Sequence, residues 1–237
     1  MDEPLYTGIV DIHHADGSYN LEAVKAGGVG FLWHKATEGV EGPGSHDAGF
    51  PQAMDRAKAC GVRRGAYHYG NNVHAPERQA EEFVATVRSL TDHRGIVLAL
   101  DLEGALDHPN TMKTEDAARF IVRVAELTGI TPVLYAGRSK LGERCENASP
   151  YVLQVFRRTR LWLAAYGHKY DPRRVTPPPP WSRYWLHQYT NGADGPDDKV
   201  LFPRRTLGFA REAQDRSCYR GTFAELAADW DAMGLRE

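Results

Sequence analysis

The chain contains 237 residues, of which 42% are hydrophobic and 25% are charged, and its formal net charge is −2 at pH 7. This length suits one α/β barrel or two small domains, and the hydrophobic content excludes an intrinsically disordered chain. The balanced charge gives no electrostatic reason to expect nucleic acid or an anionic membrane as a partner, and the apolar runs are shorter than the roughly 20 residues that a membrane span requires.

The first half of the chain alternates predicted strands with predicted amphipathic helices. Residues 1–4 are acidic and contain no apolar segment, so we expect no signal peptide ahead of the first strand. Strands are predicted at residues 6–12, 30–36, 64–69 and 95–104, and helices at residues 20–26, 47–60, 76–90 and 114–128. Because strands alternate with helices in this way, we expect a parallel sheet.

The second half departs from this alternation. Strands are predicted at residues 132–136, 160–165 and 184–189, and no amphipathic helix separates the last two, because residues 177–180 are consecutive prolines. A last strand is expected within residues 206–216, and Thr222 is expected to cap a final helix over residues 222–233. Five strand–helix pairs followed by strands with few helices predict a single-domain α/β barrel over residues 1–237, with its core at about 6–223. Three widely spaced cysteines predict neither a disulfide framework nor a zinc site.

The most informative stretch is residues 95–104, an apolar run followed by two acids. Asp101 and Glu103 are two residues apart on a predicted strand, so both side chains should project from the same face. They lie at the carboxyl end of that strand, where parallel α/β folds place their active sites. Residues at this spacing have Cα atoms roughly 6.6 Å apart, and their carboxyl groups can approach to the roughly 5 Å expected in retaining glycosidases. The pair is therefore a candidate for acid/base chemistry, in which an ionised Asp101 would raise the pKa of Glu103.

Other polar and aromatic side chains gather where the remaining strands are predicted to end. Carboxylates ringed by tyrosine and tryptophan are typical of a sugar-binding cleft, because flat rings stack on sugars while acids contact the hydroxyl groups and the glycosidic oxygen. The candidates, in chain order, are Asp11, His13, His14, Lys35, Glu38, Tyr67, His68, Tyr69, Tyr135, Trp162, Tyr166, Trp185, Gln188, Tyr189 and Asp215.

Several short motifs, in a fixed order, resemble a known family. They are Gly8-Ile9-Val10-Asp11, Lys35-Ala36-Thr37-Glu38-Gly39, Gly65-Ala66-Tyr67-His68-Tyr69, Asp101-Leu102-Glu103, Leu161-Trp162-Leu163-Ala164, Gln188-Tyr189-Thr190, and Asp215 before Gly221-Thr222. Together they resemble the glycoside hydrolase family 25 lysozymes, the Chalaropsis-type muramidases that are common among phage endolysins. The resemblance extends from Tyr6 to about Phe223.

The resemblance implies a fold, a reaction and a set of roles. It implies an irregular (β/α)5β3 barrel that cleaves the β-1,4 bond between N-acetylmuramic acid and N-acetylglucosamine in peptidoglycan, without a cofactor or a metal. Glu103 would be the acid/base residue, and Asp101 would orient the substrate N-acetyl group for an assisted attack with retention. Asp11 and Asp215 would be the other site acids. The implied partner is the glycan strand, and we expect a monomer that acts on the cell wall, either released through holin pores from a host cytoplasm or secreted by a less obvious route.

The chain also departs from the family pattern. After Asp11 the chain has Ile12-His13-His14-Ala15-Asp16, whereas the family usually has His or Ser followed by an aromatic residue and Gln. His34 replaces the usual aliphatic residue before Lys35, and His187 stands where Trp is common. Near the end, Asp215-Arg216-Ser217-Cys218-Tyr219 differs from the preferred Asp-x-Asn-x-Phe. These differences affect the assignment of Asp215 and the local subsites more than that of Glu103.

Two other functions compete with a muramidase. A barrel of this kind could bind peptidoglycan without cleaving it, although a binding module has no need of both Asp101 and Glu103. Alternatively, His13, His14, His34, His68 and His187 together with Asp101 could hold a catalytic metal ion, as in metal-dependent barrel hydrolases. Against this reading, His13 and His14 are adjacent and should point to opposite faces of an extended chain.

Overall fold

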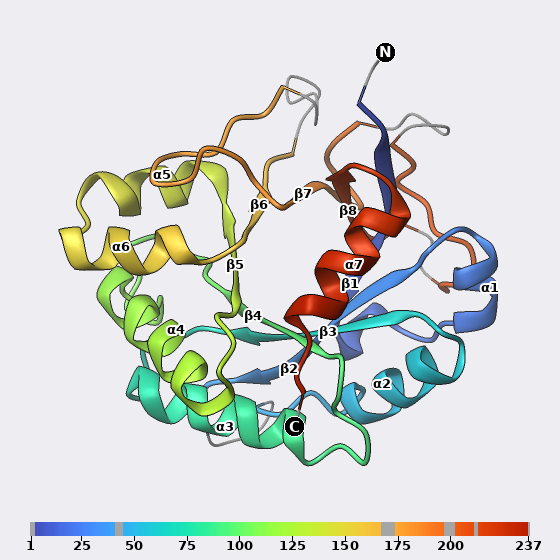
Figure 1. The fold of residues 1–237 in the computed structure, drawn as a ribbon, viewed down its shortest axis with the longest axis horizontal. Helices are drawn as coiled ribbons and strands as arrows, with labels where there is room; N and C mark the ends of the chain where they lie inside the picture. The colour runs from blue at the N-terminus through green and yellow to red at the C-terminus, as the bar shows by residue number, and fades with distance from the viewer. Residues whose placement is uncertain (1–2, 41–44, 167–173, 197–201, 211–212, 237) are drawn as a thin grey trace.

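A closed eight-stranded barrel forms the centre of the molecule (Figure 1). The computed structural model describes residues 3–40, 45–166, 174–196, 202–210 and 213–236. The strands are β1 (Leu5–Ile12), β2 (Phe31–Glu38), β3 (Arg63–Tyr69), β4 (Val97–Asp101), β5 (Val133–Gly137), β6 (Leu161–Ala164), β7 (Leu186–Asn191) and β8 (Asp215–Arg220). Neighbouring strands from β1 to β7 pair in parallel in chain order, and β8 closes the barrel by running antiparallel to both β7 and β1. The predicted α/β barrel with a largely parallel core is thus confirmed.

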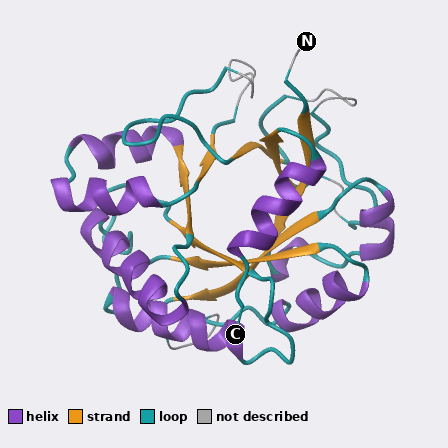
Figure 2. Ribbon diagram, viewed as in Figure 1, coloured by secondary structure: helices purple, strands orange, loops and turns teal. Residues whose placement is uncertain are grey.

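Helices surround the strands on the outside (Figure 2). They are the short 3-10 turn η1 (His14–Asp16) and the helices α1 (Leu21–Ala26), α2 (Phe50–Ala59), α3 (Pro76–Arg88), α4 (Thr114–Thr128), α5 (Arg138–Glu146), α6 (Pro150–Arg158) and α7 (Phe223–Met233). Helices follow each of the first five strands, whereas the described residues between β6 and β8 contain no helix. This is the irregular (β/α)5β3 pattern that the resemblance implied. No described helix combines the length and the apolar character that crossing a membrane requires.

The strands alternate between an outer face that packs on the helices and an inner face that fills the barrel. On β2, for example, Leu32 belongs to the outer core, whereas Phe31 and Trp33 belong to the inner core. The inner core is strongly aromatic, and the Trp33 and Trp162 rings stack with centroids 4.9 Å apart. Because alternation has a period of two, the same inner face that is apolar in mid-strand carries the polar residues at the strand ends.

The final helix closes one end of the barrel. Thr222 caps α7 as predicted, since its side chain accepts a hydrogen bond from the Glu225 N–H and the Glu225 carboxylate accepts one from the Thr222 N–H. Leu226 and Trp230 of α7 belong to the inner core, and Trp230 Nε1 donates to Arg64 O at 3.0 Å. The barrel is therefore plugged from this side by a helix.

Two sequence predictions in the second half need correction. The last strand was expected within residues 206–216, but β8 begins only at Asp215 and continues to Arg220. In addition, no residue range was predicted for a helix between the fifth and sixth strands, yet α5 and α6 lie there. Helix α5 has a weak apolar pattern with only Leu141, Arg144 and Cys145 buried, which explains why periodicity did not reveal it.

Candidate active site

A cavity of about 250 Å³ opens at the end of the barrel where the parallel strands terminate. Every strand except β7 contributes to its lining, because the inward-facing residue at each strand end points toward the barrel axis. All four predicted acids lie here. The lining residues are Asp11, His13, Lys35, Tyr67, Tyr69, Asp101, Glu103, Tyr135, Trp162 and Asp215.

A second hollow of about 270 Å³ adjoins the first and shares Glu103 and Tyr135 with it. The rest of its lining is residues 137–140, at the end of β5 and the start of α5, and residues 164–166. Glu103 therefore lies between the two hollows.

The backbone around Asp101 and Glu103 holds the two carboxyl groups on the same side. Asp101 is the last residue of β4, and the ladder extends one residue further because the Leu102 N–H donates to Tyr135 O at 2.9 Å. Leu102 is fully buried, so the residues on either side of it both face the cavity. Gly104 follows with φ of +83°, and a Cβ there would lie 2.3 Å from Thr111 Oγ1, so a glycine is needed where the chain turns away.

Asp101 and Glu103 differ in their surroundings. Asp101 is only 9% exposed, and its Oδ1 is buried without a hydrogen-bond partner among the described residues. Glu103 is exposed at the cleft and lies beside the Tyr135 hydroxyl. A buried carboxylate oxygen that has no partner is costly to maintain, so we interpret Asp101 Oδ1 as a group that awaits a donor from the substrate.

A chain of hydrogen bonds fixes Asp11 on the opposite side of the cavity. Gln188 on β7 donates from Nε2 to both carboxylate oxygens of Asp11, at 2.8 and 2.9 Å. The Gln188 Oε1 accepts in turn from the Tyr135 hydroxyl at 2.7 Å and from the Tyr166 hydroxyl. Gln188 is fully buried, so it acts through Asp11 rather than by lining the cavity.

Asp215 reaches the site by a different route from the other acids. It is the first residue of β8 and lies opposite Asp11 in the antiparallel pairing with β1. Since β8 runs against the parallel strands, its amino end coincides with their carboxyl ends. The prediction that Asp215 ends the last strand is wrong, because Asp215 begins β8. Asp215 nevertheless lines the cavity, as predicted.

Three carboxyl groups of the site, those of Asp11, Asp101 and Glu103, have a raised pKa. Burial raises the pKa of Asp101 well above its ordinary value, the charges of Glu103 and Asp11 raise it further, and Lys35 opposes them. Although Glu103 opens onto the cleft, the protein around its carboxyl group removes water from it and so raises its pKa, and the Tyr135 hydroxyl opposes this effect. For Asp11, burial and then the charge of Asp215 raise the pKa, and the Gln188 hydrogen bond lowers it. The expected direction of the Glu103 shift is thus correct, but desolvation raises this pKa, not the charge of Asp101.

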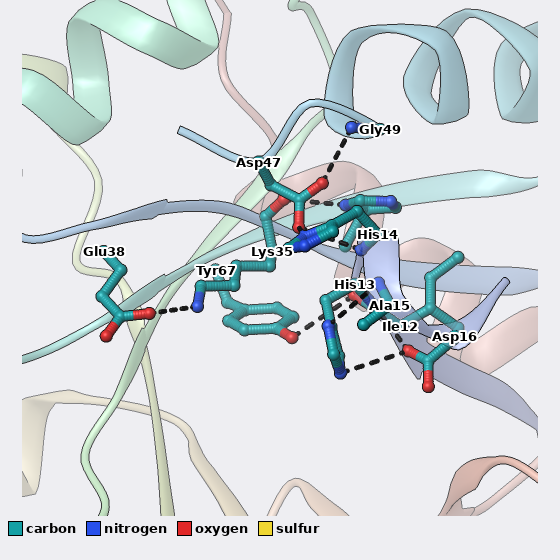
Figure 3. Close-up of polar contacts among 11 residues, drawn as sticks. Ile12, His13, His14, Ala15, Asp16, Lys35, Glu38, Asp47, Gly49 and Tyr67 are labelled. Carbon is teal, nitrogen blue, oxygen red and sulfur yellow. Dashed lines mark hydrogen bonds and ion pairs between the residues drawn. The ribbon is translucent and has the colours of Figure 1, made fainter. Parts of the chain in front are cut away.

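The cation and tyrosines on β2 and β3 form the wall beside these acids. Lys35 forms an ion pair with Glu38 (Figure 3). The Lys35 ammonium group also lies 5.4 Å from the centre of the Tyr69 ring. Tyr67 donates from its hydroxyl to Ile12 O at 3.3 Å, which ties β3 to the end of β1. Lys35, Tyr67 and Tyr69 line the cavity as predicted, whereas Glu38 is not part of the lining and contacts it through Lys35.

The predicted aromatic residues divide between the two ends of the barrel. Trp162 lines the cavity, packs edge-on against Tyr135 with centroids 4.7 Å apart, and donates from Nε1 to Ser217 Oγ at 2.8 Å. The prediction that Trp185 lines the cleft is wrong, because Trp185 precedes β7 and lies at the opposite end of the barrel. There its Nε1 donates to Asp229 Oδ2 at 3.1 Å, and its ring packs on Trp230 of the closing helix. Trp185 therefore does not contribute to this site.

The histidines considered for metal catalysis do not gather around Asp101. Buried His68 contacts Thr37 Oγ1 at 2.8 Å and Gln79 Oε1 at 3.0 Å. His34 and His187 each contact a backbone carbonyl oxygen, at 2.7 and 3.0 Å.

His13 and His14 behave differently from the expectation. We expected them on opposite faces of an extended chain, but His13 is the cap of the η1 turn and His14 is its first residue, so the alternation of a strand does not apply. Both rings lie near Asp47 in the loop before α2.

One contributor to the site escaped the sequence analysis entirely. Arg144 on α5 is 1% exposed and donates from Nη2 to Glu103 O at 3.2 Å and from Nη1 to Met112 O at 2.9 Å. It therefore holds the backbone of Glu103 from behind. No local motif marks Arg144, so its role could have been inferred only if α5 had been predicted correctly.

Known proteins match both the sequence and the fold. The family model described as "Glycosyl hydrolases family 25" matches residues 10–198. Among curated relatives, an "Autolytic lysozyme" of Clostridium acetobutylicum is 35% identical over 82 residues, covering 35% of this chain and 24% of the relative. "Lysozyme M1" of Streptomyces globisporus is 33% identical over 96 residues, covering 40% of this chain and 32% of the relative. These matches thus span a third or less of each relative.

Solved structures resemble the barrel over nearly its whole length. A bacterial lysozyme from Streptomyces coelicolor superposes with a TM-score of 0.75 at 22% identity, covering 94% of this chain and 96% of the other. A family GH25 lysozyme from Aspergillus fumigatus gives a TM-score of 0.69 at 20% identity, with coverage of 95% and 98%. Likeness at this level of identity establishes the fold, and the family match, which spans most of the chain, establishes that this chain belongs to glycosyl hydrolase family 25.

Proposed function

We propose that the protein is a peptidoglycan muramidase that hydrolyses the β-1,4 bond between N-acetylmuramic acid and N-acetylglucosamine and acts at the bacterial cell wall. The observation that carries the proposal is the placement of Asp101 and Glu103 on one side of a cleft lined by Tyr69, Tyr135 and Trp162. The cleft combines acids with aromatic rings, as recognition of a sugar chain requires. Family membership and the printed names of the relatives, which are lysozymes, support it.

In this proposal Glu103 is the general acid and base. It stands between the two hollows of the cleft, and its raised pKa favours the protonated form that must donate to the glycosidic oxygen. Once the leaving sugar departs, the Glu103 carboxylate can accept a proton from the incoming water. Arg144 keeps the Glu103 backbone in place during both steps.

We further propose that the substrate N-acetyl group assists the reaction, which then retains the anomeric configuration. Asp101 Oδ1, buried and without a partner among the described side chains, would accept the N–H of that acetamido group and aim its carbonyl oxygen at the anomeric carbon. Asp11 and Asp215, across the cavity, would stabilise the positive charge that develops on the sugar ring.

Mass analysis of muropeptides tests the reaction. Purified peptidoglycan is digested, in EDTA, with the wild type, with Glu103→Gln and with Glu126→Gln, a control that removes a surface carboxylate paired with Arg123. We expect new reducing N-acetylmuramic acid ends from the wild type and the control, and none from Glu103→Gln. Reducing N-acetylglucosamine ends would show that the enzyme cleaves the other glycosidic bond and is not a muramidase. Release of stem peptides without new reducing ends would refute a glycosidase.

Two further outcomes separate the alternatives. Binding to sedimented cell walls without any product from either wild type or control would favour a non-catalytic binding barrel. Loss of wild-type activity in EDTA, restored by added metal, would favour a metal-dependent hydrolase. The stereochemistry is followed separately by NMR of the first anomer released, and initial release of the α-anomer would refute retention.

A further inference from the structure

The tandem histidines lie outside the proposed reaction but are not isolated. His13 and His14 lie at the turn after β1, and Asp47 lies in the loop between β2 and α2. One ligand atom from each of the three side chains lies within 4.8 Å of the other two (Figure 3). Within the part of the chain that the structure describes, this is the one group of at least three histidine, cysteine or acidic side chains placed closely enough to share a metal ion.

Asp47 is held in a fixed position before any ligand arrives. Its side chain is fully buried, and Oδ1 accepts from the Gly49 N–H at 2.9 Å. Oδ2 accepts from the backbone N–H of His14 at 3.0 Å, and His14 Nδ1 lies 2.8 Å from the same oxygen. A carboxylate oxygen and an imidazole nitrogen thus already face each other across the two loops.

His13 completes the group from the side of the cleft. Its ring packs edge-on against His14 with centroids 5.8 Å apart, and Asp16 Oδ2 lies 3.6 Å from its Nε2. The other ring nitrogen, Nδ1, accepts from the Ala15 N–H at 3.3 Å, a long contact that a metal ion would have to replace. The capping of η1 by His13 and Asp16 holds the His13 ring beside His14 and Asp47, so three ligand atoms lie together.

We propose that His13, His14 and Asp47 bind one divalent transition-metal ion, with Zn²⁺ as the best match, at the edge of the cleft. Two imidazoles and one carboxylate suit Zn²⁺, with water in the remaining position, whereas Mg²⁺ and Ca²⁺ prefer oxygen ligands throughout. The ion joins the loop after β1 to the loop after β2. His13 also lines the cavity, so the ion site adjoins the substrate cleft.

The site does not depend on the proposed reaction, so its test uses binding rather than hydrolysis. Untagged protein is titrated with Co²⁺, followed by its visible absorption, and with Zn²⁺, followed by calorimetry. The variants are His13→Ala and His14→Ala, with His108→Ala as a control that removes a histidine on the exposed part of another loop. His13 and His14 are 43% and 58% exposed, so neither replacement should prevent folding, and circular dichroism checks this.

We expect one equivalent of Co²⁺ or Zn²⁺ to bind the wild type and the control, and each of the other variants to bind at least about tenfold more weakly. The melting temperature should rise on addition of Zn²⁺ in the wild type and the control only. The proposal is overturned if the wild type binds no more tightly than a His13→Ala/His14→Ala double variant, or if His108→Ala weakens binding as much as His14→Ala does.

Discussion

Replacement of Gln188 by leucine should make Asp11 harder to ionise while leaving the other acids of the site in place. Gln188 is buried, and its Nε2 lies 2.8 and 2.9 Å from the two Asp11 oxygens. Leucine has a similar volume but no donor, and a hydrogen bond to a charged group contributes about 1.5–3 kcal/mol. If the transition state needs ionised Asp11, the loss corresponds to a drop in kcat/KM of about 10- to 150-fold.

The pH dependence of Gln188→Leu carries the stronger test. In the wild type, burial and the Asp215 charge raise the pKa of Asp11, and the Gln188 hydrogen bond lowers it. Leucine removes the one opposing contact, so the pKa rises further, more Asp11 is protonated at a given pH, and the acid limb of the activity profile moves to higher pH. The deficit should therefore be greatest in acid and become smaller as the pH rises.

The assay measures initial release of reducing ends from purified peptidoglycan as a function of pH, with Tyr166→Phe as the control. Tyr166 contacts the Gln188 Oε1, so this variant leaves the bond between Gln188 and Asp11 in place and should not move the acid limb. A folded Gln188→Leu protein with the wild-type acid limb and a kcat/KM within about twofold of the wild type would refute the reasoning.

Three further substitutions test other parts of the structure. Trp230→Ala should lower the free energy of unfolding in urea by about 3–5 kcal/mol because it empties the closed end of the barrel, whereas Phe223→Ala, at a residue that is 45% exposed, should cost far less. Arg144→Met leaves two carbonyl oxygens without their donor and should reduce kcat by about 10- to 100-fold with little change in KM; an equal effect on both constants would count against a positioning role. Asp101→Asn should abolish activity yet raise the free energy of unfolding by about 1 kcal/mol at neutral pH. Because the folded-state pKa of Asp101 is raised, the wild type loses stability as the pH rises through that pKa, so the gain should vanish in acid, and a gain independent of pH would contradict the burial argument.

Local patterns were sufficient to predict the half of the site that lies on regular parallel strands. Period-two alternation places Asp11, Lys35, Tyr67, Asp101 and Tyr135 on the inner face of the barrel, and all five line the cavity at the end where the parallel strands terminate. There the spacing along the chain and the position in space are connected by the strand geometry alone, so no knowledge of distant contacts is needed.

The same reasoning failed where a distant element decides the position. Trp185 belongs to the start of a strand rather than its end, and it is buried by α7, which lies far along the chain. Asp215 reaches the site only because β8 is antiparallel. Arg144 supports Glu103 from a helix with a weak apolar pattern, through a contact with a backbone atom 41 positions away. These placements depend on tertiary packing, and a single sequence carries no local signal of them.

The pairing of β1 with β8 has a consequence for biosynthesis. During translation, β1 leaves the ribosome before the other strands and must wait until β8 is made before it gains its second partner. Phe31 and Trp33 lack the helix that covers them until Trp230 has been added. Closure of such a barrel is dominated by contacts between distant parts of the chain, which makes it slow and leaves apolar surface exposed in the meantime. A nascent chain that stalls before residue 215 would present an open sheet edge on β1 and a row of uncovered aromatic rings, so this protein should depend on chaperones late in synthesis rather than early.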